Sequence, residues 1–258
     1  MPIATRSYPA DIVPPITAAS LIAGLRDGLI ASGFPQPLKQ YVIGTDQYCV
    51  WEFNFDPTKT YGKTYYRLKV TSGLITTHSI GAGWTDATNT LVNPCNEAHQ
   101  ITYSSSVPVK SWGFSTPEFC LLSTSQGTLY QLLGYFRFVD MPSFDEMAFP
   151  KTFIPMAADV ATVSCTGLTP YNTSQFPTSL NNTAMGVADA FLQQRSQVAS
   201  FFVYSPTNGG IAGRSSDDLS MGACSNMNRG DIFQYLSSNP PEQYILLRPG
   251  AGAMMIRI

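Results

Sequence analysis

The segment that decides the fold begins with Cys49-Val50-Trp51-Glu52-Phe53-Asn54-Phe55. Its odd-numbered positions carry Cys, Trp and Phe, whereas Val, Glu and Asn occupy the even-numbered ones. The same alternation recurs in Tyr65–Val70, and again in Tyr130–Phe138, where apolar residues alternate with Gln131 and Arg137. A period of two residues places one set of side chains on a buried face and the other set in water. The region from Tyr41 to Phe138 is therefore predicted to be a series of β-strands.

Turn-forming residues separate these strands at short intervals. Asp56–Gly62, Ser72-Gly73 and Gly81–Gly83 each interrupt an apolar run, and Thr85–Asn89 is predicted to be the tip of a hairpin. Ser125–Gly127 connects two further strands. Strands at this spacing, without helices between them, favour an antiparallel sheet over a parallel one. We expect a mainly β protein built as an antiparallel β-sandwich.

Two helices are expected beside these strands. Thr17 is a suitable N-cap for a helix over Ala18–Ser32, in which leucines recur every four residues at positions 21, 25 and 29. Gly33 is expected to end this amphipathic helix. A second, short helix is predicted over Ala184–Gln194, with Thr183 as its cap.

The chain divides into three regions. Residues 1–16 contain four prolines and are expected to form an extended arm, and residues 17–140 hold the first helix and the antiparallel β domain. Residues 141–258 form a second β-rich region that is either a separate domain or part of the first. Within it, Ser205–Gly230 is rich in Gly, Ser, Asn and Asp and is predicted to be a long exposed loop. The chain ends in a hairpin that is expected to turn at Pro249–Gly252.

Composition excludes several classes of function. Charged residues make up 12% of the chain, against about 25% in typical soluble domains, and the formal net charge is −2. The sequence has no run of Lys or Arg, so we expect no nucleic-acid partner. Its apolar runs are far shorter than the ~20 residues that span a bilayer, so we expect no membrane association. The N-terminus lacks the features of a secretion signal, which favours synthesis in a cytoplasm.

The cysteines and histidines of the sequence give little support for a metal site or a redox function. Five cysteines are scattered without a CxxC pair, and Cys49 and Cys120 are expected to be reduced thiols in the core. Cys95 and His99 are four residues apart, and the second histidine, His78, lies in a Thr-rich strand. A metal site needs three or four ligands, and no others cluster nearby. We therefore expect no metal ion and no cofactor.

Catalytic constellations are also missing from the sequence. The carboxylate pairs Asp145/Glu146 and Asp217/Asp218 are adjacent residues, which point to opposite faces of a strand, so we interpret them as solvated loop charges. There is no Gly-x-Ser-x-Gly motif, and Gly209–Arg214 lacks phosphate-loop spacing and is interpreted as a flexible loop. No catalytic residue is predicted.

Aromatic side chains leave one binding function open. The candidates for stacking on a sugar ring are Trp51, Trp84, Trp112 and Tyr135. Trp84 stands beside the predicted hairpin tip and is the best candidate for an exposed ring. Aromatic residues on alternating strands are more often part of the core.

Several motifs together resemble virion structural proteins of tailed bacteriophages, of the kind encoded near tail and baseplate genes. They are Ala31–Phe34, Tyr48–Asp56, Lys59–Gly62, Ile80–Trp84, Leu133–Phe138 and the closing Arg248-Pro249-Gly250. The similarity covers roughly residues 17–139 and the C-terminal hairpin, and it transfers no catalytic residues.

The resemblance implies a non-enzymatic structural protein of the virion, assembled in the host cytoplasm and placed in the tail, adaptor or baseplate region. Its partners would be further copies of the chain and other virion proteins. The contacts are expected from the arm, the Ser205–Gly230 loop and the terminal strand, at Tyr8, Ile12, Ile211, Arg214, Met255 and Ile256. The alternatives are a carbohydrate-binding module that recognises a host surface glycan through Trp84, a capsid decoration protein and, last, a hydrolase.

Overall fold

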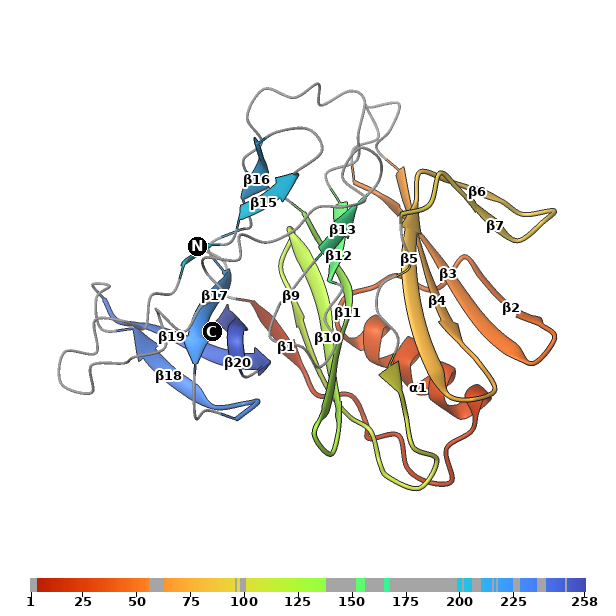
Figure 1. The fold of residues 1–258 in the computed structure, drawn as a ribbon, viewed down its shortest axis with the longest axis horizontal. Helices are drawn as coiled ribbons and strands as arrows, with labels where there is room; N and C mark the ends of the chain where they lie inside the picture. The colour runs from red at the N-terminus through yellow and green to blue at the C-terminus, as the bar shows by residue number, and fades with distance from the viewer. Residues whose placement is uncertain are drawn as a thin grey trace.

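The computed structural model describes residues 4–55, 63–95, 97, 101–137, 152–155, 165–167, 199–200, 202–205, 210–214, 216, 218–224, 228–235, 240–248 and 250–258. In this part of the chain the protein is mainly β, with antiparallel sheets and one α-helix (Figure 1). The prediction of a mainly antiparallel β protein is confirmed at this level. The second helix, predicted over Ala184–Gln194, lies outside the described residues.

Six strands form what we call the central sheet, in the order β1-β9-β10-β11-β12-β13. Every neighbouring pair in it is antiparallel. The bounds are β1 Thr5–Ser7, β9 Lys110–Ser115, β10 Phe119–Gln126, β11 Leu129–Arg137, β12 Thr152–Pro155 and β13 Cys165–Gly167.

Five strands form the helix-side sheet, in the order β2-β3-β4-β5-β8. Their bounds are β2 Lys39–Ile43, β3 Asp46–Asn54, β4 Lys63–Val70, β5 Ile75–Gly81 and β8 Ile101–Thr102. A separate hairpin follows β5 and consists of β6 (Gly83–Thr85) and β7 (Thr90–Val92). Thr85 pairs with Thr90, so the turn falls at the tip that the sequence predicted.

Five strands near the end of the chain form the C-terminal sheet, in the order β14-β17-β20-β19-β18. Their bounds are β14 Ala199–Ser200, β17 Leu219–Cys224, β18 Ile232–Tyr235, β19 Glu242–Arg248 and β20 Gly250–Arg257. A two-stranded sheet of β15 (Phe202–Ser205) and β16 (Gly210–Arg214) accompanies it.

The helix α1 spans Ala18–Ala31, close to its predicted bounds. The N-cap Thr17 accepts a hydrogen bond at Oγ1 from the backbone N–H of Ser20, and the Ser20 hydroxyl accepts one from the Thr17 N–H in return. Gly33, with φ +115°, follows the C-cap. The leucines at positions 21, 25 and 29 are fully buried, as expected for an amphipathic helix. Helix α1 packs on β3 and β4 on one side and on β9 and β10 on the other.

The central sheet is buried on both faces. Cys120 and Leu122 of β10 belong to a core cluster shared with α1 and the helix-side sheet. Phe119 and Leu121, on the other parity of the same strand, belong to a cluster shared with β17, β19 and β20. Figure 1 shows the same order in space, with β9, β10 and β11 between the helix-side sheet and the C-terminal sheet. The described strands β17, β19 and β20 therefore form a second core cluster with the face of the central sheet that is turned away from α1.

A polar link crosses the core between the helix-side sheet and the central sheet. The Tyr66 hydroxyl oxygen lies 2.8 Å from His78 Nδ1 and accepts a hydrogen bond of 3.1 Å from the backbone N–H of Gly134 on β11. Gly134 has φ +112°, and an added Cβ would meet the Cys120 carbonyl oxygen, so this position requires glycine. Burial raises the pKa of the Tyr66 hydroxyl, which keeps it protonated as a hydrogen-bond donor.

Three sequence expectations are corrected. Gln131, predicted to face water, is buried because this face of β11 lies against the helix-side sheet, where its Oε1 accepts a 2.9 Å hydrogen bond from Tyr103. The predicted loop Ser205–Gly230 contains β16 and β17, and β17 lies inside the C-terminal sheet. Asp218 is not a solvated loop charge, since it is buried and its carboxylate accepts a 2.8 Å hydrogen bond from Arg257 Nε.

Residues 4–16 are extended but lie on their own chain. β1 pairs with β9, and the backbone N–H groups of Ile12 and Ile16 donate to the carbonyls of Val109 and Ser105. The side chains of Ile12 and Ile16 are buried in the core beside α1. In these residues the arm is part of the fold rather than a free extension.

Candidate functional site

The outer face of the helix-side sheet, opposite α1, carries the most distinctive surface of the described chain. Tyr41 of β2 is paired with Tyr48 of β3, and both stand on the opposite parity to the core residues Cys49 and Trp51. Val50 shares this outer parity yet is fully buried, so the outer face is covered at that position. The β6–β7 hairpin lies on this side of the sheet and packs near β4.

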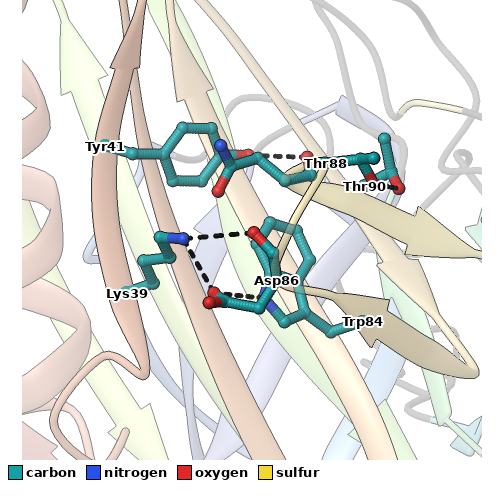
Figure 2. Close-up of polar contacts among 7 residues, drawn as sticks. Lys39, Tyr41, Trp84, Asp86, Thr88 and Thr90 are labelled. Carbon is teal, nitrogen blue, oxygen red and sulfur yellow. Dashed lines mark hydrogen bonds and ion pairs between the residues drawn. The ribbon is translucent and has the colours of Figure 1, made fainter.

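Polar contacts fasten the hairpin tip to strand β2. Lys39 Nζ lies 2.7 Å from Asp86 Oδ1 and 3.3 Å from the Asp86 backbone oxygen. The Tyr41 hydroxyl donates to the carbonyl of Asn89 at 3.4 Å. Figure 2 shows these contacts together, with the Trp84 ring beside Asp86 and the Tyr41 ring next to them. The hairpin is thus held against residues that precede it by more than 40 positions.

Three half-buried aromatic rings form a row on this face. The rings of Tyr41 and Tyr48 are parallel, at an angle of 4°, with centroids 4.7 Å apart. The Trp84 ring also contacts Tyr41, with centroids 5.8 Å apart and an angle of 42°. Arg67 and Lys69 lie over Tyr48 at 5.9 and 5.8 Å. Tyr41 is therefore in contact with two other rings.

The charges around this row are balanced in pairs. Lys39 pairs with Asp86, Lys69 with Asp46 at 3.2 Å, and Arg67 with Glu97 at 2.9 Å. Hydrogen bonds from Lys39 and Trp84 hold the pKa of the Asp86 carboxyl below its usual range, so it is ionised at neutral pH. Burial raises the pKa of the Tyr41 hydroxyl, which keeps it protonated. The surface therefore offers an anion, a cation and hydroxyl groups without a net charge.

Of the other aromatic candidates, two lie in the interior and Trp112 is partly buried. Trp51 is fully buried, and Tyr135 belongs to the same core cluster. Trp112 lies under the guanidinium of Arg229, 4.1 Å from its ring centroid. Of the four candidates named from the sequence, Trp84 alone joins the outer aromatic row. Sequence reasoning missed Tyr41 and Lys39 as its neighbours.

The predicted subunit-contact residues fall into three groups. Tyr8 is 66% exposed. Ile12, Met255 and Ile256 are buried inside the chain, so their side chains are not available to a partner in this conformation. Ile211 and Arg214 lie in β16, whose side chains are outside the described residues.

A different exposed apolar cluster appears at the edge of the helix-side sheet. Strand β2 is an edge strand, and Leu38, Val42 and Ile43 are each more than half exposed on or beside it. Sequence reasoning missed this cluster as well. The sequence does contain a signal for this cluster: Val42 and Ile43 are consecutive residues of a strand, so their side chains point to opposite faces and at least one of them lies on the exposed face.

The groups that suggested chemistry serve the fold. His78 is buried and contacts the Tyr66 hydroxyl, and Cys95 Sγ accepts a 3.2 Å hydrogen bond from the backbone N–H of Ile80. Asp145, Glu146, His99 and Asp217 lie outside the described residues. Among the described residues, no three His, Cys, Asp or Glu side chains are grouped so as to hold a metal ion.

No protein-family model matches this chain, and no curated protein matches it. Within the described ranges, no helix has both the length and the apolar character needed to cross a membrane.

Proposed function

We propose that the chain is a non-enzymatic structural subunit of a tailed-bacteriophage virion, in its tail, adaptor or baseplate region. Its work is to contact further copies of itself and other virion proteins. In this proposal the packed antiparallel sheets act as a β-sandwich scaffold that presents contact surfaces. The motifs from Ala31 to Phe138 that resemble virion proteins support the assignment to this class of protein. The exposed apolar edge at β2 is the observation that supports assembly through subunit contacts.

Strand β2 has the properties of an edge that accepts another strand. An edge strand directs every second backbone N–H and C=O away from its sheet, and these groups are a template for pairing with another chain. Val42 and Ile43 flank this edge on opposite faces of the sheet, and Leu38 lies at its start. An added strand would cover these apolar side chains as it satisfied the backbone groups.

The usual protection against such pairing is weak at this edge. Natural proteins often place a lysine on an exposed edge strand, where its charge opposes the approach of another strand. Lys39 is the only charged residue of β2, and its ammonium group is paired with Asp86 on the hairpin. The low overall charge of the chain, 12%, suits a protein with broad contact surfaces, since Lys and Glu are depleted in interfaces.

A charge placed on this edge tests the proposal. The matched variants are Val42→Glu, on the edge, and Val107→Glu, at an exposed valine in the segment before β9. Sedimentation velocity is expected to show wild type and Val107→Glu in assemblies heavier than the 28.1 kDa chain, and Val42→Glu shifted to the monomer. Circular dichroism should give the same spectrum for all three proteins.

Two results would refute the assignment of assembly to β2. One is a wild-type protein that sediments as a monomer at every concentration. The other is a Val42→Glu variant that assembles as wild type does.

A further inference from the structure

We propose that the outer face beside the β6–β7 hairpin is a binding site for a neutral saccharide, with the Trp84 indole as its stacking surface and Asp86 as its hydroxyl acceptor. This site is separate from the assembly edge, because the side chains of Trp84, Tyr41 and Tyr48 stand on the outer face of the sheet whereas strand pairing uses the backbone of β2 in the sheet plane.

The stacking surface is held in a fixed orientation. Trp84 is half-buried, so part of its indole remains open to solvent. Its Nε1–H donates to Asp86 Oδ1 at 3.4 Å, and Tyr41 supports the ring from the side of the sheet. A pyranose ring presents an apolar face of C–H groups, and a rigid aromatic ring with one polar end suits such a face. A ring already held in place loses little conformational freedom on binding.

Hydrogen-bonding groups surround this ring. The Asp86 carboxylate is exposed, and within the described chain its hydrogen bonds and ion pair all fall on Oδ1 or on the backbone oxygen. Oδ2 is therefore available to accept from sugar hydroxyls. Lys39 Nζ supplies a donor 2.7 Å from the same carboxylate, and the Thr88 and Thr90 hydroxyls, 2.7 Å apart, lie at the exposed tip (Figure 2).

An unsatisfied acceptor at the tip is a second, independent observation. Asn89 Oδ1 is buried and, among the described residues, has no hydrogen-bond donor. Asn89 also has φ +54°, in the left-handed region. A buried acceptor without a donor is costly and uncommon in folded proteins. Because this oxygen has no surface open to solvent, a ligand hydroxyl would supply the missing donor only after a rotation of the Asn89 side chain.

The charge pattern selects a neutral ligand. Four cations stand on this face within the described residues, namely Lys39, Lys63, Arg67 and Lys69, and each is paired with a carboxylate, so none of them is left to attract a phosphate, sulfate or carboxylate group. The Lys39 ammonium and the Asp86 carboxylate place a hydrogen-bond donor next to an acceptor, and two adjacent hydroxyl groups of a sugar ring could bind to this pair. A charged glycan would have to break one of these pairs.

A glycan array tests the proposal, with neutral hexose and N-acetylhexosamine oligosaccharides as probes and sialylated and sulfated glycans as the charged set. Wild type is expected to bind neutral glycans only. Isothermal titration with the best neutral glycan should show at least about tenfold weaker binding for Trp84→Ala and for Asp86→Asn. Tyr8→Ala, which removes an exposed ring elsewhere, should bind as wild type does.

The variants separate loss of the site from loss of the fold. Asp86 is an exposed residue in the hairpin turn, so Asp86→Asn should keep the melting temperature of wild type even if Trp84→Ala does not. An array without neutral hits, binding confined to charged glycans, or wild-type affinity in Asp86→Asn would each overturn the proposal.

Discussion

Replacing Tyr66 by phenylalanine should destabilise this protein far more than the same replacement at its neighbour Tyr65. The substitution removes one oxygen atom and leaves the ring, which packs edge-on against Phe34 with centroids 5.2 Å apart. That oxygen lies 2.8 Å from His78 Nδ1 and accepts a hydrogen bond from the Gly134 N–H at 3.1 Å, inside the core between the helix-side sheet and the central sheet. The variant therefore isolates the contribution of a buried cross-sheet hydrogen bond.

The expected magnitude follows from the two contacts that are lost. A net hydrogen bond contributes about 0.5–1.5 kcal/mol, and a buried group left without a partner costs about 1–3 kcal/mol. Because the Gly134 N–H loses its acceptor, we expect Tyr66→Phe to lower the free energy of unfolding by about 2–4 kcal/mol. For a domain of this size the melting temperature should fall by roughly 5–15 °C.

Urea unfolding followed by circular dichroism measures this difference, and Tyr65→Phe is the matched control. The Tyr65 hydroxyl also makes one hydrogen bond, to Glu52 Oε2 at 2.8 Å, but on the partly exposed outer face. Water can replace that bond, so the loss should stay below about 1 kcal/mol. Equal losses in the two variants, or a Tyr66→Phe protein as stable as wild type, would show that the reasoning is wrong.

Two further predictions follow from buried groups. Arg229 stacks on Trp112 and donates from Nε to Ser123 Oγ at 2.9 Å, and burial lowers the pKa of its guanidinium to about 10. We expect Arg229→Lys to lower the free energy of unfolding by about 1–3 kcal/mol, because an ammonium group lacks the planar donor geometry of a guanidinium. A thermal unfolding curve identical to that of wild type would contradict this. Burial raises the pKa of the Cys49 thiol from 9.0 to about 12, so its thiolate fraction at pH 8 falls about 1,000-fold. Peptide mass spectrometry after iodoacetamide treatment should find Cys49 unmodified in the native protein and alkylated in urea, whereas rapid native labelling would show that the residue is accessible.

The periodicity of apolar residues in the sequence was sufficient to predict an element where one of its faces is buried and the other is exposed. The alternation in β4 and the leucine spacing in α1 are of this kind, and both elements fold as predicted. The alternation predicted for Tyr130–Phe138 failed in β11, because both faces of the central sheet are covered and Gln131 is buried with the apolar residues. Strand β17 was missed because its small and polar residues, Leu219 to Cys224, resemble a loop in composition.

The candidate site could be predicted only in part for a related reason. Trp84 stands beside a turn that the sequence makes evident, so an exposed aromatic ring was a reasonable expectation. Its neighbours Lys39 and Tyr41 are more than 40 residues earlier and reach it because the hairpin folds back over the sheet. The spacing of residues along the chain does not predict these contacts. It depends on the tertiary fold.

The position of β20 has a consequence for how the protein is made. This strand ends at Arg257, yet it lies in the middle of the C-terminal sheet and covers one side of the central sheet. During translation, Phe114, Leu121 and Phe136 are synthesised long before the residues that cover them. Until β17, β19 and β20 have been synthesised and have folded onto the central sheet, these apolar side chains lack their cover, and a chain truncated before β20 would leave them exposed.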